Sequence, residues 1–153
     1  MPIMINGLEE LKAGVGQEAV SGWADVGQEA VNEFAEATGD LNPIHVDEEF
    51  ARQTPFGGTI ASGYNVLSLT PKFISSLWDI KGFDFGILYG FNRIRFPAPL
   101  PVGSRVRMRL RVASVEPITG GAQITAELTF EREGSDKPVC VAEYLARVYG
   151  GNA

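Results

Sequence analysis

The chain has 153 residues, of which 44% are hydrophobic and 21% are charged, close to the average for a globular protein. This length favours one domain with a buried core, and the lack of an apolar run of roughly 20 residues excludes a membrane-spanning helix. The net charge of −6 argues against nucleic acid as a partner, because that affinity comes mainly from neutralised phosphates. The first residues lack the basic start and the apolar stretch of a secretory signal, so we expect a cytoplasmic protein.

Cysteine and histidine occur once each, which leaves no ligand set for a structural zinc site and no partner for an intramolecular disulfide. We therefore expect neither a metal nor a cofactor. Cys140 stands beside small apolar residues in an alternating run, which is typical of a buried strand residue rather than of a nucleophile.

The first half of the chain is predicted to be mainly helical. Apolar residues recur at helical spacing over 28–38, and Gly39 follows where a residue with a left-handed backbone would end the helix. The run 45–53 indicates a short helix with Asp47 as its cap. The stretch 54–63 is rich in turn-forming residues and is predicted to be a connector.

A second and longer helix is predicted from about Ser62 to Leu77, where apolar residues cluster at steps of three and four. Pro71 conflicts with an unbroken helix, because an internal proline removes one backbone hydrogen bond and usually kinks the rod. We therefore expect this helix to bend between Leu67 and Pro71, or to begin later than Ser62.

The second half contains four strand-like segments separated by proline or glycine turns, at 85–96, 104–115, 122–133 and 138–149. Apolar and polar residues alternate strictly in the second and third segments, which predicts an antiparallel sheet with one wet face. A helical front followed by consecutive strands predicts an α+β fold, in which a long helix packs on one side of a curved antiparallel sheet.

The run GDLNPIH at 39–45 carries the clearest chemical pattern in the sequence. Asp40 and the only histidine, His45, stand five residues apart in a segment that Pro43 stiffens, so both side chains can point into one space. A carboxylate beside an imidazole is suited to acid-base work near neutral pH. Asn42 could hold a water molecule there or brace the pair.

The same spacing also permits a purely structural interpretation, in which Asp40 and Asn42 cap the turn after Gly39 and His45 lies on the surface. Spacing alone does not decide between the two. A serine-hydrolase site built from Ser62 and His45 is disfavoured, because the chain has no G-x-S-x-G elbow.

The run GDLNPIH resembles the signature G-D-x-N-P-x-H of the MaoC-like, (R)-specific enoyl-CoA hydratases at every fixed position. The similarity extends through HVDEEFARQTPFGGTIASG to FNRIRFPAPLPVGSRVR and covers most of residues 28–112. It implies a single hot-dog domain over 1–153, with a long central helix wrapped by the sheet. This agrees with the order of elements read from the residues.

The resemblance also implies site roles. Asp40 and His45 would bind and activate water, Asn42 would orient it, and the Gly63 backbone N–H would stabilise the thioester oxyanion. Family members commonly have His-Gly where this chain has Ser62-Gly63, so Ser62 would contact substrate, alter the pocket or cap the helix. The implied reaction is reversible hydration of a trans-2-enoyl-CoA to a (3R)-3-hydroxyacyl-CoA.

Two other functions stay open at this point: hydrolysis of an acyl-CoA thioester, and binding of acyl thioesters without catalysis. The resemblance further implies a homodimer.

Six arginines fall between Arg93 and Arg111. They could attract the phosphates of coenzyme A, or they could form a solvated sheet face that balances the acidic front of the chain.

Overall fold

The computed structural model describes residues 1–151. The elements follow in the order β1 (Ile3–Asn6), α1 (Leu8–Ala13), β2 (Glu18–Val20), β3 (Ala24–Asp25), α2 (Gln28–Thr38), α3 (Pro43–Val46), α4 (Glu48–Arg52), β4 (Ile60–Ala61), α5 (Gly63–Ser68), α6 (Thr70–Leu77), β5 (Trp78–Lys81), β6 (Phe85–Arg95), β7 (Leu100–Pro101), β8 (Arg105–Ile118), β9 (Gly121–Arg132) and β10 (Cys140–Tyr149). No helix in this part of the chain is both long and apolar enough to cross a membrane.

The main sheet is antiparallel and has the strand order β2-β8-β9-β10-β6, with β3 also pairing with β8. The predicted alternation in β8 is confirmed, because Val106, Met108, Leu110 and Val112 are all fully buried in the core. Their neighbours point to the other face, since successive side chains of a strand alternate in direction. Cys140, at the start of β10, is likewise buried in the core, as expected.

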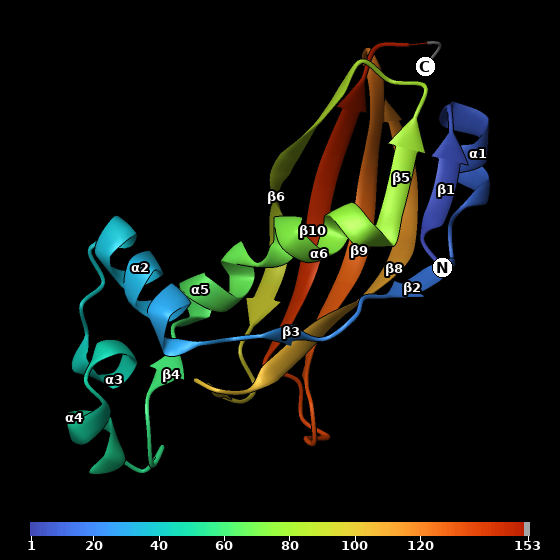
Figure 1. The fold of residues 1–153 in the computed structure, drawn as a ribbon. Helices are drawn as coiled ribbons and strands as arrows, with labels where there is room; N and C mark the ends of the chain where they lie inside the picture. The colour runs from blue at the N-terminus through green and yellow to red at the C-terminus, as the bar shows by residue number, and fades with distance from the viewer. Residues whose placement is uncertain (152–153) are drawn as a thin grey trace.

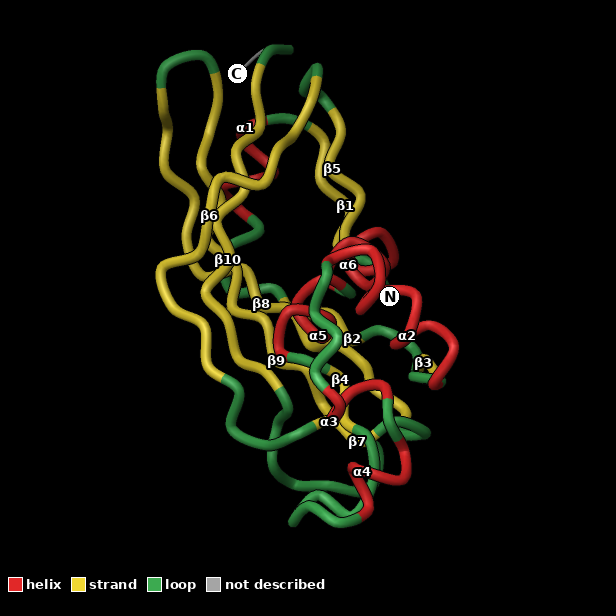
Figure 2. Tube along the Cα trace, turned by 90° about the vertical axis from the view of Figure 1, so that its left-hand side faces the viewer, coloured by secondary structure: helices red, strands yellow, loops and turns green. Residues whose placement is uncertain are grey.

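Helices α5 and α6 run across the inner face of this sheet, as Figures 1 and 2 show. The helix predicted for 62–77 is confirmed in position, but it is not continuous, because Leu69 separates α5 from α6. The Leu69 N–H bonds to the carbonyl of Val66, three residues back, which tightens the last turn of α5. Pro71 falls in the first turn of α6, where its missing N–H costs no helical bond. The bend expected between 67 and 71 is therefore present.

The short strands outside the main sheet could not be predicted from local sequence patterns. β1 pairs in parallel with β5, so Ile3 lies opposite Trp78 and Asn6 opposite Lys81. β4 makes a two-residue antiparallel pair with β7, in which Ile60 lies opposite Pro101.

Helices α2, α3 and α4 lie together at one end of the molecule, beside α5 and β4 (Figure 1). Gly39 ends α2 with φ 76° and ψ 11°, the left-handed conformation that was predicted for it. The short helix predicted with Asp47 as its cap is confirmed as α4, because Asp47 accepts a 3.0 Å bond from the Phe50 N–H. His45 lies before this cap and belongs to the separate short helix α3, which begins at Pro43 because proline suits the first position of a helix.

Candidate active site

Asp40 and His45 face each other, as the motif predicted. Asp40 follows the end of α2 and His45 lies in α3, and 3.6 Å separates Asp40 Oδ2 from His45 Nε2. His45 is only 7% exposed, whereas the side chain of Asp40 is 39% exposed. The burial of His45 rules out the interpretation of this residue as a surface histidine.

The other ring nitrogen of His45 fixes the tautomer. Nδ1 lies 2.7 Å from the backbone carbonyl oxygen of Ile60, which can only accept a hydrogen bond. The proton of a neutral His45 must therefore be on Nδ1, which leaves the Nε2 lone pair directed toward Asp40. An ionised Asp40 is also an acceptor, so both groups can accept hydrogen bonds from one molecule with two O–H donors, such as water.

Asn42 is exposed and serves as the N-cap of α3. Its Oδ1 accepts a 3.3 Å bond from the Ile44 N–H. No hydrogen bond links this carboxamide to Asp40 or to the imidazole of His45 among the residues that the structure describes. In this structure Asn42 shapes the segment that presents His45.

Ser62 and Gly63 form the start of α5. Ser62 is the N-cap, and its Oγ accepts a 3.0 Å bond from the Asn65 N–H. Gly63 is the first residue of the helix, and its N–H donates to no acceptor within residues 1–151. The ring of Phe96 covers the Cα of Gly63, because a Cβ at this position would lie 3.0 to 3.2 Å from the ring atoms.

One small cavity brings these groups together. It is lined by Val31, Phe34, Ala35, Asp40, His45, Ser62 and Asn65. Three of the predicted site residues, Asp40, His45 and Ser62, therefore share one space, while Asn42 and Gly63 do not line it.

Asn65 is the residue at this cavity that the sequence did not single out. It is only 7% exposed, and its carboxamide makes no hydrogen bond to another residue in the described part of the chain. No side-chain N or O atom in the described residues is both fully buried and unpaired, so the Asn65 carboxamide is open to the cavity and available to bond to a ligand. The available signal was an asparagine placed one turn after Ser62.

A larger and mostly apolar cavity of about 690 Å³ lies between α5, α6 and the strands β6 and β10. It is lined by Tyr64, Leu67, Ser68, Thr70, Pro71, Ile74, Ser75, Leu88, Phe91 and Tyr144. Tyr64, one of its lining residues, directly follows Gly63 in α5, whereas Gly63 itself does not line the cavity.

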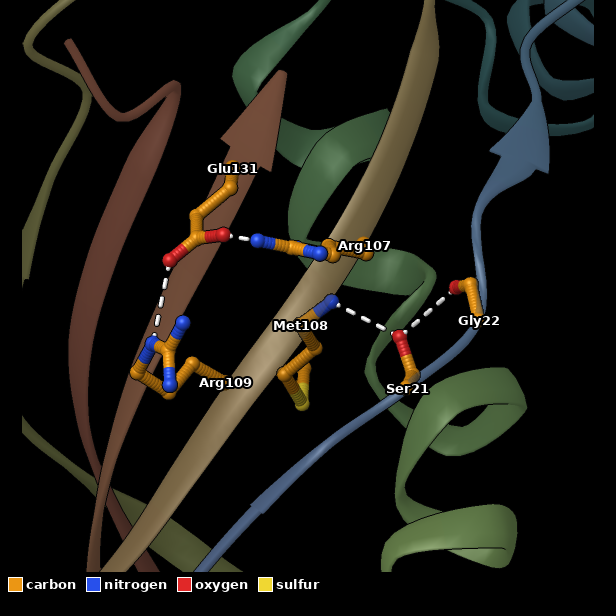
Figure 3. A network of polar contacts seen from close by, with 6 residues as sticks. All are labelled: Ser21, Gly22, Arg107, Met108, Arg109 and Glu131. Atoms are coloured by element: carbon orange, nitrogen blue, oxygen red, sulfur yellow. Dashed lines mark hydrogen bonds and ion pairs between the residues drawn. The ribbon is translucent and has the colours of Figure 1, made fainter. Parts of the chain in front are cut away.

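The arginines of β8 pair with carboxylates on the neighbouring strand β9. Glu131 accepts bonds from Arg107 Nε at 2.7 Å and from Arg109 Nε at 3.1 Å (Figure 3). Partial burial acts to raise the pKa of Glu131, but these two bonds outweigh it and hold the pKa below its ordinary value. Arg105 pairs in the same way with Glu133 at 2.9 Å.

This pairing supports the interpretation of the arginine cluster as a solvated sheet face. Arg111 completes the row through Glu127 at 3.3 Å, and Arg107 also stacks on the ring of Trp23. The partners are mostly glutamates of β9 rather than the acidic front of the chain, of which only Asp25 takes part, 3.6 Å from Arg105.

A helix laid across one face of an antiparallel sheet, with an Asp-His pair beside the N-cap of that helix, is the architecture of a hot-dog domain with a candidate acid-base site. Residues 12–132 match the family described as MaoC like domain. The chain belongs to the MaoC-like family, which confirms the expectation from its motif.

Named relatives extend over nearly the whole chain. The 3-hydroxyacyl-thioester dehydratase Z of Mycobacterium tuberculosis is 47% identical over 140 residues, which cover 90% of this chain and 93% of that protein. Nodulation protein N of Rhizobium leguminosarum bv. viciae is 36% identical over 143 residues, with 90% and 88% coverage.

Solved structures confirm the hot-dog fold. A protein from Archaeoglobus described as a monoamine oxidase regulatory protein superposes with a TM-score of 0.80 at 25% identity, covering 97% of each chain. The (R)-hydratase from A. caviae gives a TM-score of 0.71 at 24% identity, with 86% of this chain and 94% of that chain covered.

Proposed function

We propose that this protein is a hydro-lyase that adds water reversibly to the double bond of a trans-2-enoyl thioester, or removes it from the (3R)-3-hydroxyacyl thioester. One observation carries the proposal: His45 Nε2 lies 3.6 Å from Asp40 Oδ2, while His45 Nδ1 is tied to the Ile60 carbonyl. This geometry presents two acceptors to one water molecule. The dehydratase relative at 47% identity supports the same class of reaction.

In the hydration direction, the water oxygen attacks C3 of the enoyl thioester while Asp40 or His45 takes one of its protons. The electron pair of the double bond moves toward the thioester carbonyl, whose oxygen gains negative charge. The unpaired Gly63 N–H is the donor proposed for this oxyanion. The proton then returns from the pair to C2, which balances the addition, and the reverse sequence gives dehydration.

The acyl chain of the substrate is proposed to occupy the apolar cavity of about 690 Å³. Its apolar lining suits a hydrocarbon chain, because apolar surface is best buried against apolar surface. Its lining includes Tyr64, the residue after Gly63, and the thioester carbonyl is proposed to bind at Gly63. A coenzyme A thioester is the proposed substrate, and no cofactor takes part in this scheme.

We further propose that two copies of the chain form a homodimer through β6. This strand pairs with β10 on one edge, and no strand in residues 1–151 pairs with its other edge. Large apolar side chains on β6 are about half exposed, namely Phe85, Ile87, Leu88 and Tyr89. An exposed apolar edge strand is a site of pairing with another chain. Light scattering should give twice the monomer mass, and Ile87→Lys should shift the protein toward monomer.

The decisive experiment offers the purified protein enoyl-CoA substrates of several chain lengths. Hydration removes the absorbance of the conjugated enoyl group without releasing thiol. Release of free thiol would instead indicate a thioesterase, and binding without turnover of any substrate would indicate a non-catalytic binder. Either of these two results would overturn the proposed reaction.

A further inference from the structure

The side chain of Gln28 joins two segments that hold the opposite ends of His45. Its Nε2 donates at 2.8 Å to the backbone carbonyl of His45, and its Oε1 accepts from Thr59 Oγ1 at 2.6 Å. The second hydrogen of Nε2 goes to Asn32 Oδ1 at 2.9 Å. Gln28 is the first residue of α2, so it approaches α3 and β4 from a third element.

The orientation of these groups is determined by their chemistry. The carbonyl of His45 can only accept, so the nearer atom of Gln28 must be its nitrogen. The oxygen of the amide therefore faces Thr59, whose hydroxyl must donate. Thr59 is itself buried, and it directly precedes Ile60, the residue whose carbonyl accepts from His45 Nδ1.

These contacts close a ring. It runs from the His45 carbonyl through Gln28 to Thr59, along the backbone to Ile60, and back to the imidazole of His45. The distance from Nδ1 to the Ile60 carbonyl depends on how α3 and the start of β4 are spaced. Gln28 is the side chain that bonds to both segments and sets this spacing.

We propose that Gln28, together with Thr59, is a positioning residue that keeps His45 in the Nδ1–H tautomer. The pair acts through His45 and touches no reacting atom. Without this pair, the imidazole of His45 loses its fixed hydrogen-bond partner at Nδ1. Part of the protein population then carries the imidazole proton on Nε2. That tautomer presents a donor to the water site, where the proposed reaction needs an acceptor. The kinetic part of this inference rests on the proposed function, whereas the tautomer itself does not.

The test uses the fact that His45 is the only histidine in the chain. Nitrogen NMR of protein labelled with ¹⁵N-histidine reports the tautomer of this one ring without assignment. The key variants are Gln28→Leu, which removes both bonds, and Thr59→Val, which removes the hydroxyl at nearly constant shape. Thr59→Ser retains the hydroxyl, and Asn32→Ala removes a Gln28 partner that lies outside the ring, so both serve as matched controls.

We expect the wild type, Thr59→Ser and Asn32→Ala to show the Nδ1–H tautomer. Gln28→Leu and Thr59→Val should show a mixture of the two tautomers, with turnover lowered at least about tenfold and the Michaelis constant nearly unchanged. Circular dichroism checks that each variant is folded. If Gln28→Leu does not fold, the comparison of Thr59→Val with Thr59→Ser tests the proposal. A folded Thr59→Val that keeps a pure Nδ1–H ring would overturn the proposal. If the wild type hydrates no enoyl-CoA, the proposed function fails while the NMR test still stands.

Discussion

The ring of Phe96 packs against Gly63 so closely that a methyl group on Gly63 would lie 3.0 Å from the ring Cζ. Gly63→Ala should therefore displace Phe96, or shift the first N–H of α5. Phe96 is half exposed and can move, so we expect a loss of stability below about 1 kcal/mol.

The same variant should lower turnover by about 10- to 100-fold, because small displacements of a positioning group are costly in catalysis. The control is the double variant Gly63→Ala with Phe96→Ala, which makes room for the methyl group. Recovery of most of the turnover in the double variant would show that the clash caused the loss. Wild-type turnover in Gly63→Ala alone would contradict the role of this N–H.

Asn65 offers a test in which activity should change more than stability. Asn65→Leu keeps the volume and removes a carboxamide that bonds to no residue in the described part of the chain, so the free energy of unfolding should change by less than about 1 kcal/mol. Turnover should fall at least about tenfold if the amide contacts the reacting groups. Asn6→Leu, at an exposed asparagine of β1 that lines neither cavity, is the matched control. A destabilised variant with full activity would show that Asn65 is structural.

The sequence alone was sufficient to predict the structural features whose pattern repeats over a few neighbouring residues. The arginines of β8 alternate with Val106, Met108 and Leu110, and this period of two is enough to define a strand with one wet face. The motif likewise predicted that Asp40 and His45 face each other, because both lie within one short segment whose path Pro43 restricts.

The parts that were missed depend on contacts between distant segments. β1 has only four residues and pairs with Trp78–Lys81, so its strand conformation comes from a partner far along the chain. Asn65 becomes a site residue only because α2 and α3 pack beside the start of α5. The role of Gln28 in holding His45 depends on the same packing and leaves no trace in local spacing.

The ion pairs of Glu131 predict a stability that depends on pH. The folded state holds the pKa of this carboxyl below its ordinary value, so the pairs stabilise the protein above the unfolded pKa and cease to do so as the pH falls through the folded pKa. All three side chains are partly exposed, which limits the effect at neutral pH to about 0.5–1 kcal/mol. Urea unfolding of Glu131→Gln should show this loss at pH 7 and a smaller one in acid, with KM for enoyl-CoA unchanged. A raised KM would instead favour a role of this face in binding coenzyme A.

Cys140 predicts a second dependence at alkaline pH. Burial raises the pKa of its thiol from an ordinary value near 9 to about 11. Its contribution to stability is therefore complete below pH 9 and is lost as the pH rises toward 11, by at most about 2–3 kcal/mol. Burial also raises the pKa of Tyr144, so Cys140→Ala is needed to isolate the thiol. Between these two pH values, the free energy of unfolding of Cys140→Ala should fall by less than that of the wild type. Parallel plots of this free energy against pH would contradict the assignment of the loss to the thiol.

The Asp40-His45 pair provides the most direct test of the site. Asp40→Asn and His45→Gln nearly preserve shape, so both variants should fold as the wild type does. Each should lower turnover by at least about 100-fold, because positioned acid-base groups typically contribute about 10²–10⁴ in rate. The proposed mechanism makes these two side chains, 3.6 Å apart, act on one water molecule, so the double variant should be scarcely worse than either single one. Losses that multiply would show independent roles. Near-normal hydration by a folded Asp40→Asn would remove this site from consideration, whereas Asn42→Ala, which changes only the cap of α3, should have a milder effect.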